Sequence, residues 1–446
     1  MIWTRDEAGA YDAGVRIALC CAIVLVSAPA VAVAEADDWF RVGPYLRSPS
    51  PDAVTLVWEG EGARAAEVRI EGDERVWRLE PALRQAVRIE GLSPGARHGY
   101  EVRAGDAVAR GELQAAPPPR AAIRFAVFGN TRLDERAQRL VGATARAQAP
   151  DLALSAGNLV SDGLSDHDWR RWFSAKGPLL RDTAIAAAIG SHDLQGEHRS
   201  ADALAEYVGA PDRYHALSYG PARFLFLDSN LRDEAFEEQT EWLRAELKAA
   251  RANPEVEHIF ALSHHGPYSV GRRGGDERIR DAWAPLFEEH GVDAVFSAHD
   301  HVYSRAEAGG VRYIMTGGGG APLYPRSRGA DEASREAIRR FESAHHLVVV
   351  DVASGAVEMT ALRLDQSAIE TVSWGERRPA GPKVVAKVEE LLAPPPPPKA
   401  PTEPRRAPAD DDGPRDGRIG SLALGLLGVL ALLAGSGAIA YSRRRA

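Results

Sequence analysis

From residue 120 onward the chain alternates between short apolar runs and amphipathic stretches, and this rhythm constrains its fold more than any other feature. The apolar runs look like strands, and they lie at 122–129, 151–157, 183–190, 223–228, 258–264 and 293–298. Helical patterns occupy Glu135–Gln148, Glu237–Arg251 and Asp276–His290 between or after them. Because strand–helix alternation is typical of a sheet buried on both faces, we expect an α/β layered core over residues 120–365.

Short polar side chains or histidines follow five of these strands directly. The strand ends read Gly129-Asn130-Thr131-Arg132, Gly157-Asn158-Leu159, Gly190-Ser191-His192-Asp193, Ser263-His264-His265-Gly266 and Ala298-His299-Asp300-His301. Glycines beside them allow the backbone to turn closely. Since ligands of α/β sheets bind at the carboxyl ends of the strands, we expect these residues to share one site.

Histidines occur at three of these strand ends, and one of the ends reads His-x-His. A single histidine is more often structural, but core packing does not explain His192, His264, His299 and His301 together. Imidazole groups are preferred ligands of zinc and iron. The pattern therefore predicts a metal-binding or catalytic site.

Residues 38–117 have a different pattern, with short alternating segments separated by Gly, Pro and Ser. This is typical of a small all-β sandwich, closed by the prolines at 117–119. The segment contains no metal-ligand or nucleophile cluster. We expect it to have a packing or spacing role.

Both ends of the chain carry apolar runs. Ile17–Ala34 ends in small residues, which predicts a signal peptide over 1–36, with an uncleaved anchor as the alternative. Residues 380–418 form a linker rich in proline and charge, and 419–441 are apolar and followed by Arg443, Arg444 and Arg445. We expect a C-terminal transmembrane helix with its arginines on the cytoplasmic side, or a sorting tail removed in maturation. These ends predict an exported protein, periplasmic or on the cell surface, that is held on a membrane.

Charge and cysteine content exclude some function classes. The formal net charge is -9, so the chain has no basic footprint for nucleic acid. Its two cysteines, Cys20 and Cys21, both lie in the N-terminal apolar run. The rest of the chain therefore has no thiolate site and no disulfide.

The motifs FGNTR, DLALSAGNLVSDG, IGSHD, LSHHGPYS, HGVDAVFSAHDHVYSR and YIMTGGGGAPLY resemble, in this order, those of the calcineurin-like metallophosphoesterases. Within that family the chain is similar to the purple acid phosphatase branch, which has a preceding fibronectin-like domain. The resemblance covers residues from about Val42 to Asp365. It implies a four-layer αββα domain in which two metal ions clamp the phosphate oxygens while a metal-bound hydroxide attacks.

The resemblance also implies roles for particular residues. The family's two Asp ligands and its Asn ligand fall on Asn130, Asn158 and Ser191, and its histidine ligands fall on His264 (or His265), His299 and His301. His192 matches the histidine that stabilises the transition state or protonates the leaving group. A further family histidine is replaced near Arg272 or Arg273, and Arg132 is a candidate phosphate contact.

The replaced ligands decide what we expect of the metal centre. A neutral amide does not bridge two divalent ions or offset their repulsion as a carboxylate does. We therefore expect a degenerate site that binds one Zn, Fe or Mn ion through its three histidines, or none. Asp193 and Asp300 adjoin ligand positions, and we expect them to point elsewhere, while Asp162 and Asp228 are expected to close turns.

Three functions follow as hypotheses. The first is a weakly active or non-catalytic binding module outside the cytoplasm that takes a phosphorylated small molecule or phosphoester. The second is an active phosphatase or phosphodiesterase with a mononuclear or rearranged site. The third is a structural protein of the cell envelope.

Overall fold

The computed structural model describes residues 38–194, 201–353 and 355–375, and these contain two β-sheets. The first sheet has eleven strands within the described ranges. In spatial order they are β18 (Ala368–Gly375), β17 (Ala356–Arg363), β16 (His346–Ala353), β6 (Ile123–Phe128), β7 (Leu152–Ser155), β8 (Ala184–Ala187), β1 (Phe40–Ser50), β2 (Ala53–Ile70), β4 (Arg97–Ala104) and β5 (Ala107–Gln114), with β3 (Val76–Glu90) paired to β2. Strands β6, β7 and β8 are parallel neighbours, so their carboxyl ends lie at one edge.

The second sheet has seven strands in the same described ranges. Its order is β15 (Ile338–Glu342), β13 (Tyr303–Ala308), β14 (Val311–Thr316), β12 (Ala294–Ser297), β11 (His258–Ser263), β10 (Ala222–Leu227) and β9 (His215–Tyr219). The parallel ladder of β10, β11 and β12 directs the ends of these strands to one edge as well.

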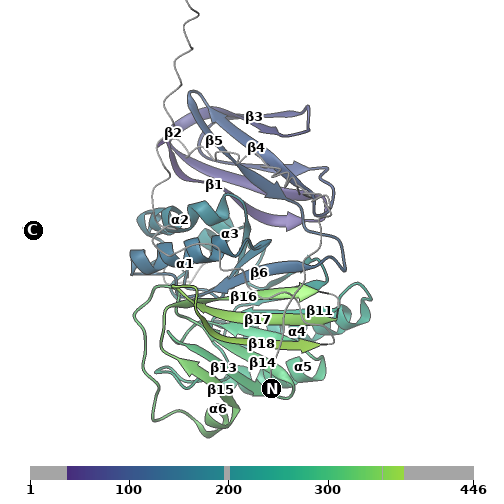
Figure 1. The fold of residues 1–446 in the computed structure, drawn as a ribbon, viewed down its shortest axis with the longest axis vertical. Coiled ribbons are helices and arrows are strands. Elements are labelled where there is room, and N and C mark those ends of the chain that lie inside the picture. The colour runs from purple at the N-terminus through teal and green to yellow at the C-terminus, as the bar shows by residue number, and fades with distance from the viewer. Residues whose placement is uncertain (1–37, 195–200, 354, 376–446) are drawn as a thin grey trace, which may run out of the picture. The chain divides into compact units, whose positions relative to one another are not determined.

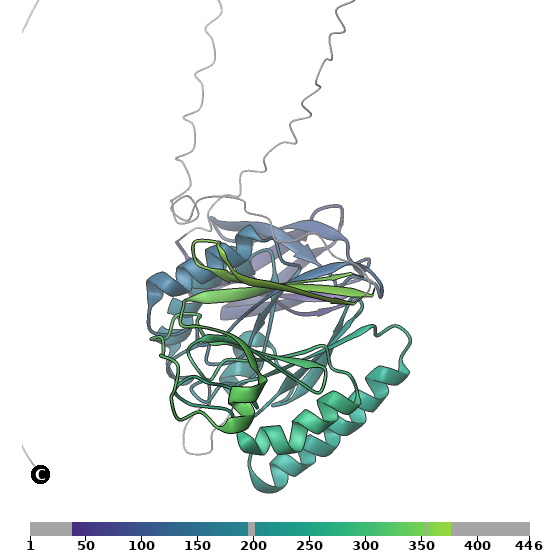
Figure 2. The ribbon, with the colours of Figure 1, turned by 60° about the horizontal axis from the view of Figure 1, so that its bottom comes forward.

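Helices cover the outer face of each sheet (Figure 1). Helices α1 (Glu135–Ala147), α2 (Asp166–Leu180) and α3 (Asp202–Val208) pack on the first sheet. Helices α4 (Asp233–Ala252) and α5 (Glu277–Glu289) run side by side on the second (Figure 2), and the short α6 (Glu332–Ala337) precedes β15. The order helix, sheet, sheet, helix confirms the four-layer core that was expected.

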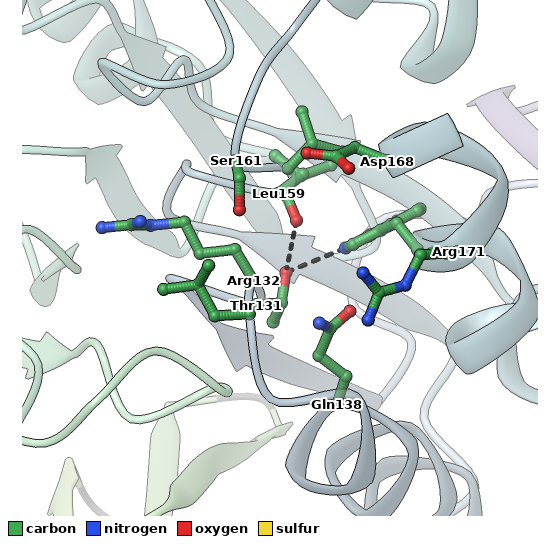
Figure 3. A pocket seen from close by; sticks show the side chains of 10 residues that line it. Thr131, Arg132, Gln138, Leu159, Ser161, Asp168 and Arg171 are labelled. Carbon is green, nitrogen blue, oxygen red and sulfur yellow. Dashed lines mark hydrogen bonds between the residues drawn. The ribbon is translucent and has the colours of Figure 1, made fainter. Parts of the chain in front are cut away.

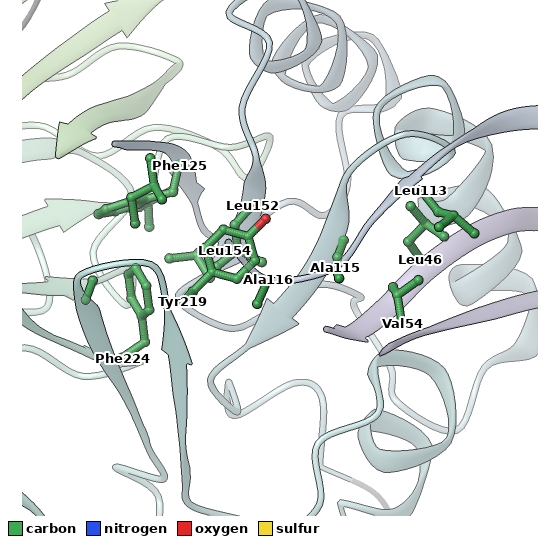
Figure 4. Packing of buried hydrophobic residues seen from close by; sticks show 14 of the residues in the cluster. Leu46, Val54, Leu113, Ala115, Ala116, Phe125, Leu152, Leu154, Tyr219 and Phe224 are labelled. Atoms are coloured by element: carbon green, nitrogen blue, oxygen red, sulfur yellow. The ribbon is translucent and has the colours of Figure 1, made fainter. Parts of the chain in front are cut away.

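The two sheets bury an apolar layer between them. Period-two alternation places Phe125 and Val127 of β6 toward the other sheet, while Ala126 and Phe128 face the helices. The ring of Phe125 lies 5.0 Å from that of Phe224 in β10, edge to face. Figure 4 shows this packing continuing from Phe125, Leu152 and Leu154 toward residues of the N-terminal strands.

The N-terminal segment is all-β as expected, and its strands belong to the same hydrogen-bonded sheet as strands of the core. Strand β1 pairs in parallel with β8 through Arg47 and Ile185, so β1–β5 extend the first sheet. In addition, β2 is one continuous strand of 18 residues, and its ladder with β3 contains register shifts between Glu59 and Ala66 that are typical of bulges. The sandwich architecture of this segment, its fibronectin-like character and the boundaries 38–117 and 120–365 stay predictions.

The strand and helix predictions for the core are confirmed within a few residues. The six predicted runs correspond to β6, β7, β8, β10, β11 and β12, and the three helical patterns correspond to α1, α4 and α5. Helix α2 was not predicted. Its sequence mixes buried Trp169, Trp172 and Phe173 with charged residues, and it has Pro178 in its last turn.

The expected transmembrane helix is corrected. In the described part of the chain, no helix combines the length and apolarity needed to cross a membrane. The longest helix there, α4, has 20 residues, which is about the span of a bilayer, but its sequence DEAFEEQTEWLRAELKAARA carries charges throughout. The predicted segments 1–36, 380–418 and 419–441 all lie outside the described residues.

Candidate functional site at the strand ends

Two buried asparagines lie at the centre of the site, directly after β6 and β7. Asn130 is fully buried and Asn158 is 3% exposed. Both adopt left-handed backbone conformations, with φ values of 52° and 55°, which Asn tolerates better than most residues. The Asn158 side-chain amide donates to the Asn130 side-chain oxygen over 2.9 Å. The two amides that were predicted to replace carboxylate ligands are therefore bonded to each other.

Each asparagine also has a backbone partner on a different strand end. The Asn130 side-chain amide donates to the carbonyl of Ala298, after β12. The backbone N–H of His192, after β8, donates to the Asn158 side-chain oxygen over 2.8 Å. The two side chains thus connect loops from both sheets.

The acids that follow His192 and His299 in the sequence are both held by backbone N–H groups. Asp193 is fully buried and accepts from the backbone N–H groups of Gly190, Asn158, Leu159 and Val160 at 2.8 to 3.3 Å. Burial raises its pKa to about 6, against the opposing effect of these hydrogen bonds. Asp300, also buried, accepts from Ser269 Oγ at 2.6 Å and from the N–H groups of Arg273 and Gly274.

Two further acids near the histidines are engaged in the same way. Asp162 closes a turn by accepting from the N–H of Leu164 over 2.9 Å. Asp276 caps helix α5 by accepting from the N–H of Ile279 over 3.1 Å. Asp228, the other acid expected to close a turn, accepts from the N–H of Asn230 over 2.8 Å and pairs with Arg213.

His264 and His299 form a hydrogen-bonded pair, and their partners fix the tautomers. His264 Nδ1 donates to the carbonyl of Ala156 over 3.1 Å, since a carbonyl only accepts. Burial holds the pKa of His264 well below its usual range, so its Nε2 carries a lone pair and accepts from His299 Nδ1 over 3.3 Å. His299 then presents its unprotonated Nε2. The neighbouring His265 bonds to Ser229, and its ring centre lies 4.2 Å from that of His299.

His301 and His192 are oriented by carbonyl groups as well. His301 Nδ1 donates to Pro322 over 2.7 Å while its ring stacks on Tyr324 with centres 4.1 Å apart. His192 Nδ1 donates to Ser161 over 2.9 Å. Burial lowers the pKa of both rings, for His301 to about 4. Both are therefore neutral near pH 7, with Nε2 as the remaining acceptor.

Two guanidinium groups supply the positive charge of the site. Burial is the main cause that lowers the pKa of His299 and of His301, each to about 4. The charge of Arg273 lowers both pKa values further, and the charge of Arg132 also lowers that of His301. Arg132 lies in the loop after β6, and its buried Nε has no hydrogen-bond partner among the described residues. Ser191 lies half-buried in the turn after β8.

A small pocket adjoins the loop of Arg132 (Figure 3). Its volume is about 200 Å³, and the loops after β6 and β7 line it together with helices α1 and α2. In Figure 3 the Arg132 side chain extends away from Thr131, whose hydroxyl accepts from the Trp172 indole over 2.8 Å. The Thr131–Leu133 backbone therefore forms a wall of this pocket.

Two helix-covered sheets with their site at the strand ends define the metallophosphoesterase fold, and comparisons with known proteins agree. Residues 104–303 match the family model described as calcineurin-like phosphoesterase. The fold is similar to that of a purple acid phosphatase from yellow lupin seeds, with TM-score 0.62 and 14% identity over 74% of each chain. It is also similar to the structure of PhoD, with TM-score 0.56 and 13% identity over 75% of this chain and 90% of that one.

The relatives found by sequence comparison match a smaller share of this chain than the two solved structures do. The chain is 27% identical over 177 residues to an uncharacterized protein of Mycobacterium tuberculosis, found in two strains. The match covers 34% of this chain and 33% of the relative. The chain thus spans about a third of the length of the curated relatives it matches.

Calcineurin-like phosphoesterases use divalent metal ions, and a pair of such ions needs anionic ligands to offset its charge. The residues of this site do not fit a pair of divalent ions, because neutral amides stand at the two positions where the resemblance predicts carboxylate ligands, and Asp193 and Asp300 accept from backbone N–H groups. Within the described ranges, no three His, Cys, Asp or Glu side chains gather closely enough to hold a metal ion. A single ion on His264, His299 and His301 stays a prediction.

The sequence identified most residues of the site but not their partners. Arg273 was noted only as a replacement for a family histidine, whereas the structure brings its charge to bear on three histidines, His192, His299 and His301. Nothing in the sequence indicated that Asn130 would bond to Ala298.

Proposed function

We propose that this protein is a non-hydrolytic binding module that takes a phosphoester or phosphorylated small molecule at the strand ends. One observation carries the proposal: the acids beside the histidines are bound by backbone N–H groups, while the charges of Arg132 and Arg273 both act on His192 and His301. A site with two guanidinium groups and no free carboxylate attracts an oxyanion. Among the described residues, the carboxylates next to the histidines are held by backbone N–H groups, and none gathers with other ligands to assemble two metal ions for hydrolysis.

Binding and turnover of the purified full chain test this proposal together. Inorganic phosphate and p-nitrophenyl phosphate are titrated calorimetrically in EDTA, and hydrolysis is followed with added Zn²⁺, Mn²⁺ and Fe²⁺. We expect binding in EDTA, and hydrolysis no faster than that of a His299→Ala/His301→Ala double variant. Metal-dependent turnover that this double variant abolishes contradicts the non-hydrolytic proposal. Absence of phosphate binding contradicts the binding role.

A mononuclear hydrolase is the competing candidate. It is favoured by the tautomers of His299 and His301, which leave Nε2 unprotonated, the form that binds a metal ion. Metal content after loading and desalting separates the candidates, since one ion per chain together with hydrolysis supports the hydrolase. Catalysis by this route was also among the expectations from the histidine pattern, with His192 as the catalytic residue.

The place of action is proposed to be outside the cytoplasm. The support is the pattern of Ile17–Ala34, an apolar run that ends in small residues. Expression in a bacterial host followed by fractionation and N-terminal sequencing tests it. A mature N-terminus near Glu35 in the exported fraction supports export, whereas an intact N-terminus in the cytoplasmic fraction contradicts it.

A further inference from the structure

The two asparagines belong to a chain of three hydrogen bonds that crosses four strand ends. It runs from the His192 backbone N–H to the Asn158 oxygen, from the Asn158 amide to the Asn130 oxygen, and from the Asn130 amide to the Ala298 carbonyl. The first three members follow β8, β7 and β6 of one sheet, and Ala298 follows β12 of the other. We name this chain from His192 to Ala298 the amide relay.

The ends of the amide relay determine the orientation of both side chains. A backbone N–H at one end only donates, so Asn158 must present its oxygen to His192 and its amide to Asn130. A carbonyl at the other end only accepts, so Asn130 must present its amide to Ala298. All three bonds therefore point in one direction, an arrangement in which hydrogen bonds polarise and strengthen one another.

Glycines pack against the amide relay and shield it from water. A Cβ at Gly190 would lie 2.3 Å from the Asn158 side-chain oxygen, and one at Gly317 would lie 2.9 Å from the Asn130 side-chain nitrogen. With both asparagines almost fully buried, a broken bond leaves a polar group with no water to replace its partner.

With aspartates at positions 130 and 158, the hydrogen bonds that connect the strand-end loops would lose their donors. An Asp at 130 would place a carboxylate oxygen against the Ala298 carbonyl, and an Asp at 158 would have no N–H for its neighbour. The repulsion between such acceptors is offset only by a proton or a cation. The amide nitrogens supply the missing donors from the chain itself.

We propose that the amide relay is a metal-free tie between the two sheets, which makes the folded strand-end site independent of divalent cations. The proposal explains how the loops stay together although the residues do not fit a pair of metal ions. It goes beyond the proposed binding function and does not depend on any ligand. A chain that fails to bind phosphate still tests it, because the readouts are stability and amide exchange.

The test uses thermal unfolding of the full chain after dialysis against EDTA, with Zn²⁺ or Mn²⁺ added back. For the natural chain we expect the same Tm in EDTA and in metal. For Asn158→Asp, and for the double variant Asn130→Asp/Asn158→Asp, we expect a Tm in EDTA lower by at least about 5 °C, because buried hydrogen bonds are lost. In the double variant we expect added Zn²⁺ to recover part of that loss.

Asn253→Asp is the matched control, since the Asn253 side-chain oxygen only accepts from the N–H of Glu255 and keeps that role as a carboxylate. Hydrogen exchange of the natural chain in EDTA requires no variant, and there we expect slow exchange of the His192 amide. A Tm of the natural chain that falls in EDTA overturns the proposal. So does rapid exchange of the His192 amide, or Asp variants as stable in EDTA as the natural chain.

Discussion

Asn158 donates its side-chain amide to the side-chain oxygen of Asn130 over 2.9 Å, at the positions where the family resemblance predicts two carboxylate ligands. The bond has a direct chemical meaning. Two carboxylates repel one another and recruit cations, whereas two amides satisfy each other. The replacements are therefore accommodated by the fold, and they change which ligands the strand ends favour.

Gly190 packs directly against Asn158, which leaves no space for a side chain at position 190. We expect Gly190→Ala to destabilise the protein by about 2–3 kcal/mol, because the new Cβ would lie 2.0 Å from the Asn158 backbone nitrogen. Urea unfolding gives the free energy. Gly177→Ala in α2 is the control, since its Cβ would meet nothing within 4 Å, and there we expect a gain of roughly 0.5–1 kcal/mol. Equal effects of the two changes contradict the prediction.

Lys176 is fully buried in α2, and burial lowers its pKa to about 7. Because the folded state holds this proton less tightly than the unfolded state, stability should rise with pH from about 7 toward the unfolded value near 10.5. We expect Lys176→Met to stabilise the protein by about 1–3 kcal/mol at pH 6 and to flatten the pH profile. Denaturant unfolding at pH 6, 7.5 and 9 measures both effects. The exposed Lys248→Met should leave the profile unchanged.

Glu59 of β2 connects the N-terminal strands to α2, with oxygens 2.8 Å from Arg84 and 3.1 Å from Arg170. Its side chain is 4% exposed. We expect Glu59→Gln to cost roughly 1–3 kcal/mol in unfolding free energy, since Arg170 loses its carboxylate partner and Arg84 keeps only Glu206. Glu67→Gln removes a more exposed partner of Arg69 and Arg78 and should cost under about 1 kcal/mol. A larger loss at Glu67 would be the opposite of what this geometry predicts.

Arg273 has its charge beside the histidines while its backbone N–H holds Asp300. Substitution by Gln removes the charge and leaves the backbone bond in place. We expect Arg273→Gln to weaken phosphate binding roughly tenfold to a hundredfold in calorimetry, as expected for one charge-assisted hydrogen bond. Arg244→Gln on the exposed side of α4 should bind like the natural chain. Unchanged affinity in Arg273→Gln removes this residue from the site.

The sequence by itself determined the layered core and the membership of the site. Alternation of apolar runs and helical patterns is local information, so β6, β7, β8, β10, β11 and β12 were all predictable, and parallel strands necessarily bring their ends together. Asn130, Asn158, His264, His299 and His301 were identified for that reason. The expected transmembrane helix was a prediction from hydropathy at the far end of the chain, and it does not appear in the described residues.

Only the tertiary structure decided what those side chains do. Left-handed turns and glycine backbone from segments far away in sequence determine the side-chain orientations at the site. This holds for Asp193, Asp300, Asn130 and Asn158. The parallel pairing of β1 with β8 is equally non-local, because Arg47 and Ile185 are separated by most of the N-terminal half of the chain. The alternation of apolar runs and helical patterns in the sequence predicts which residues follow each strand end. Hydrogen-bond partners depend on the distances between those ends, and these are set only when the two sheets pack.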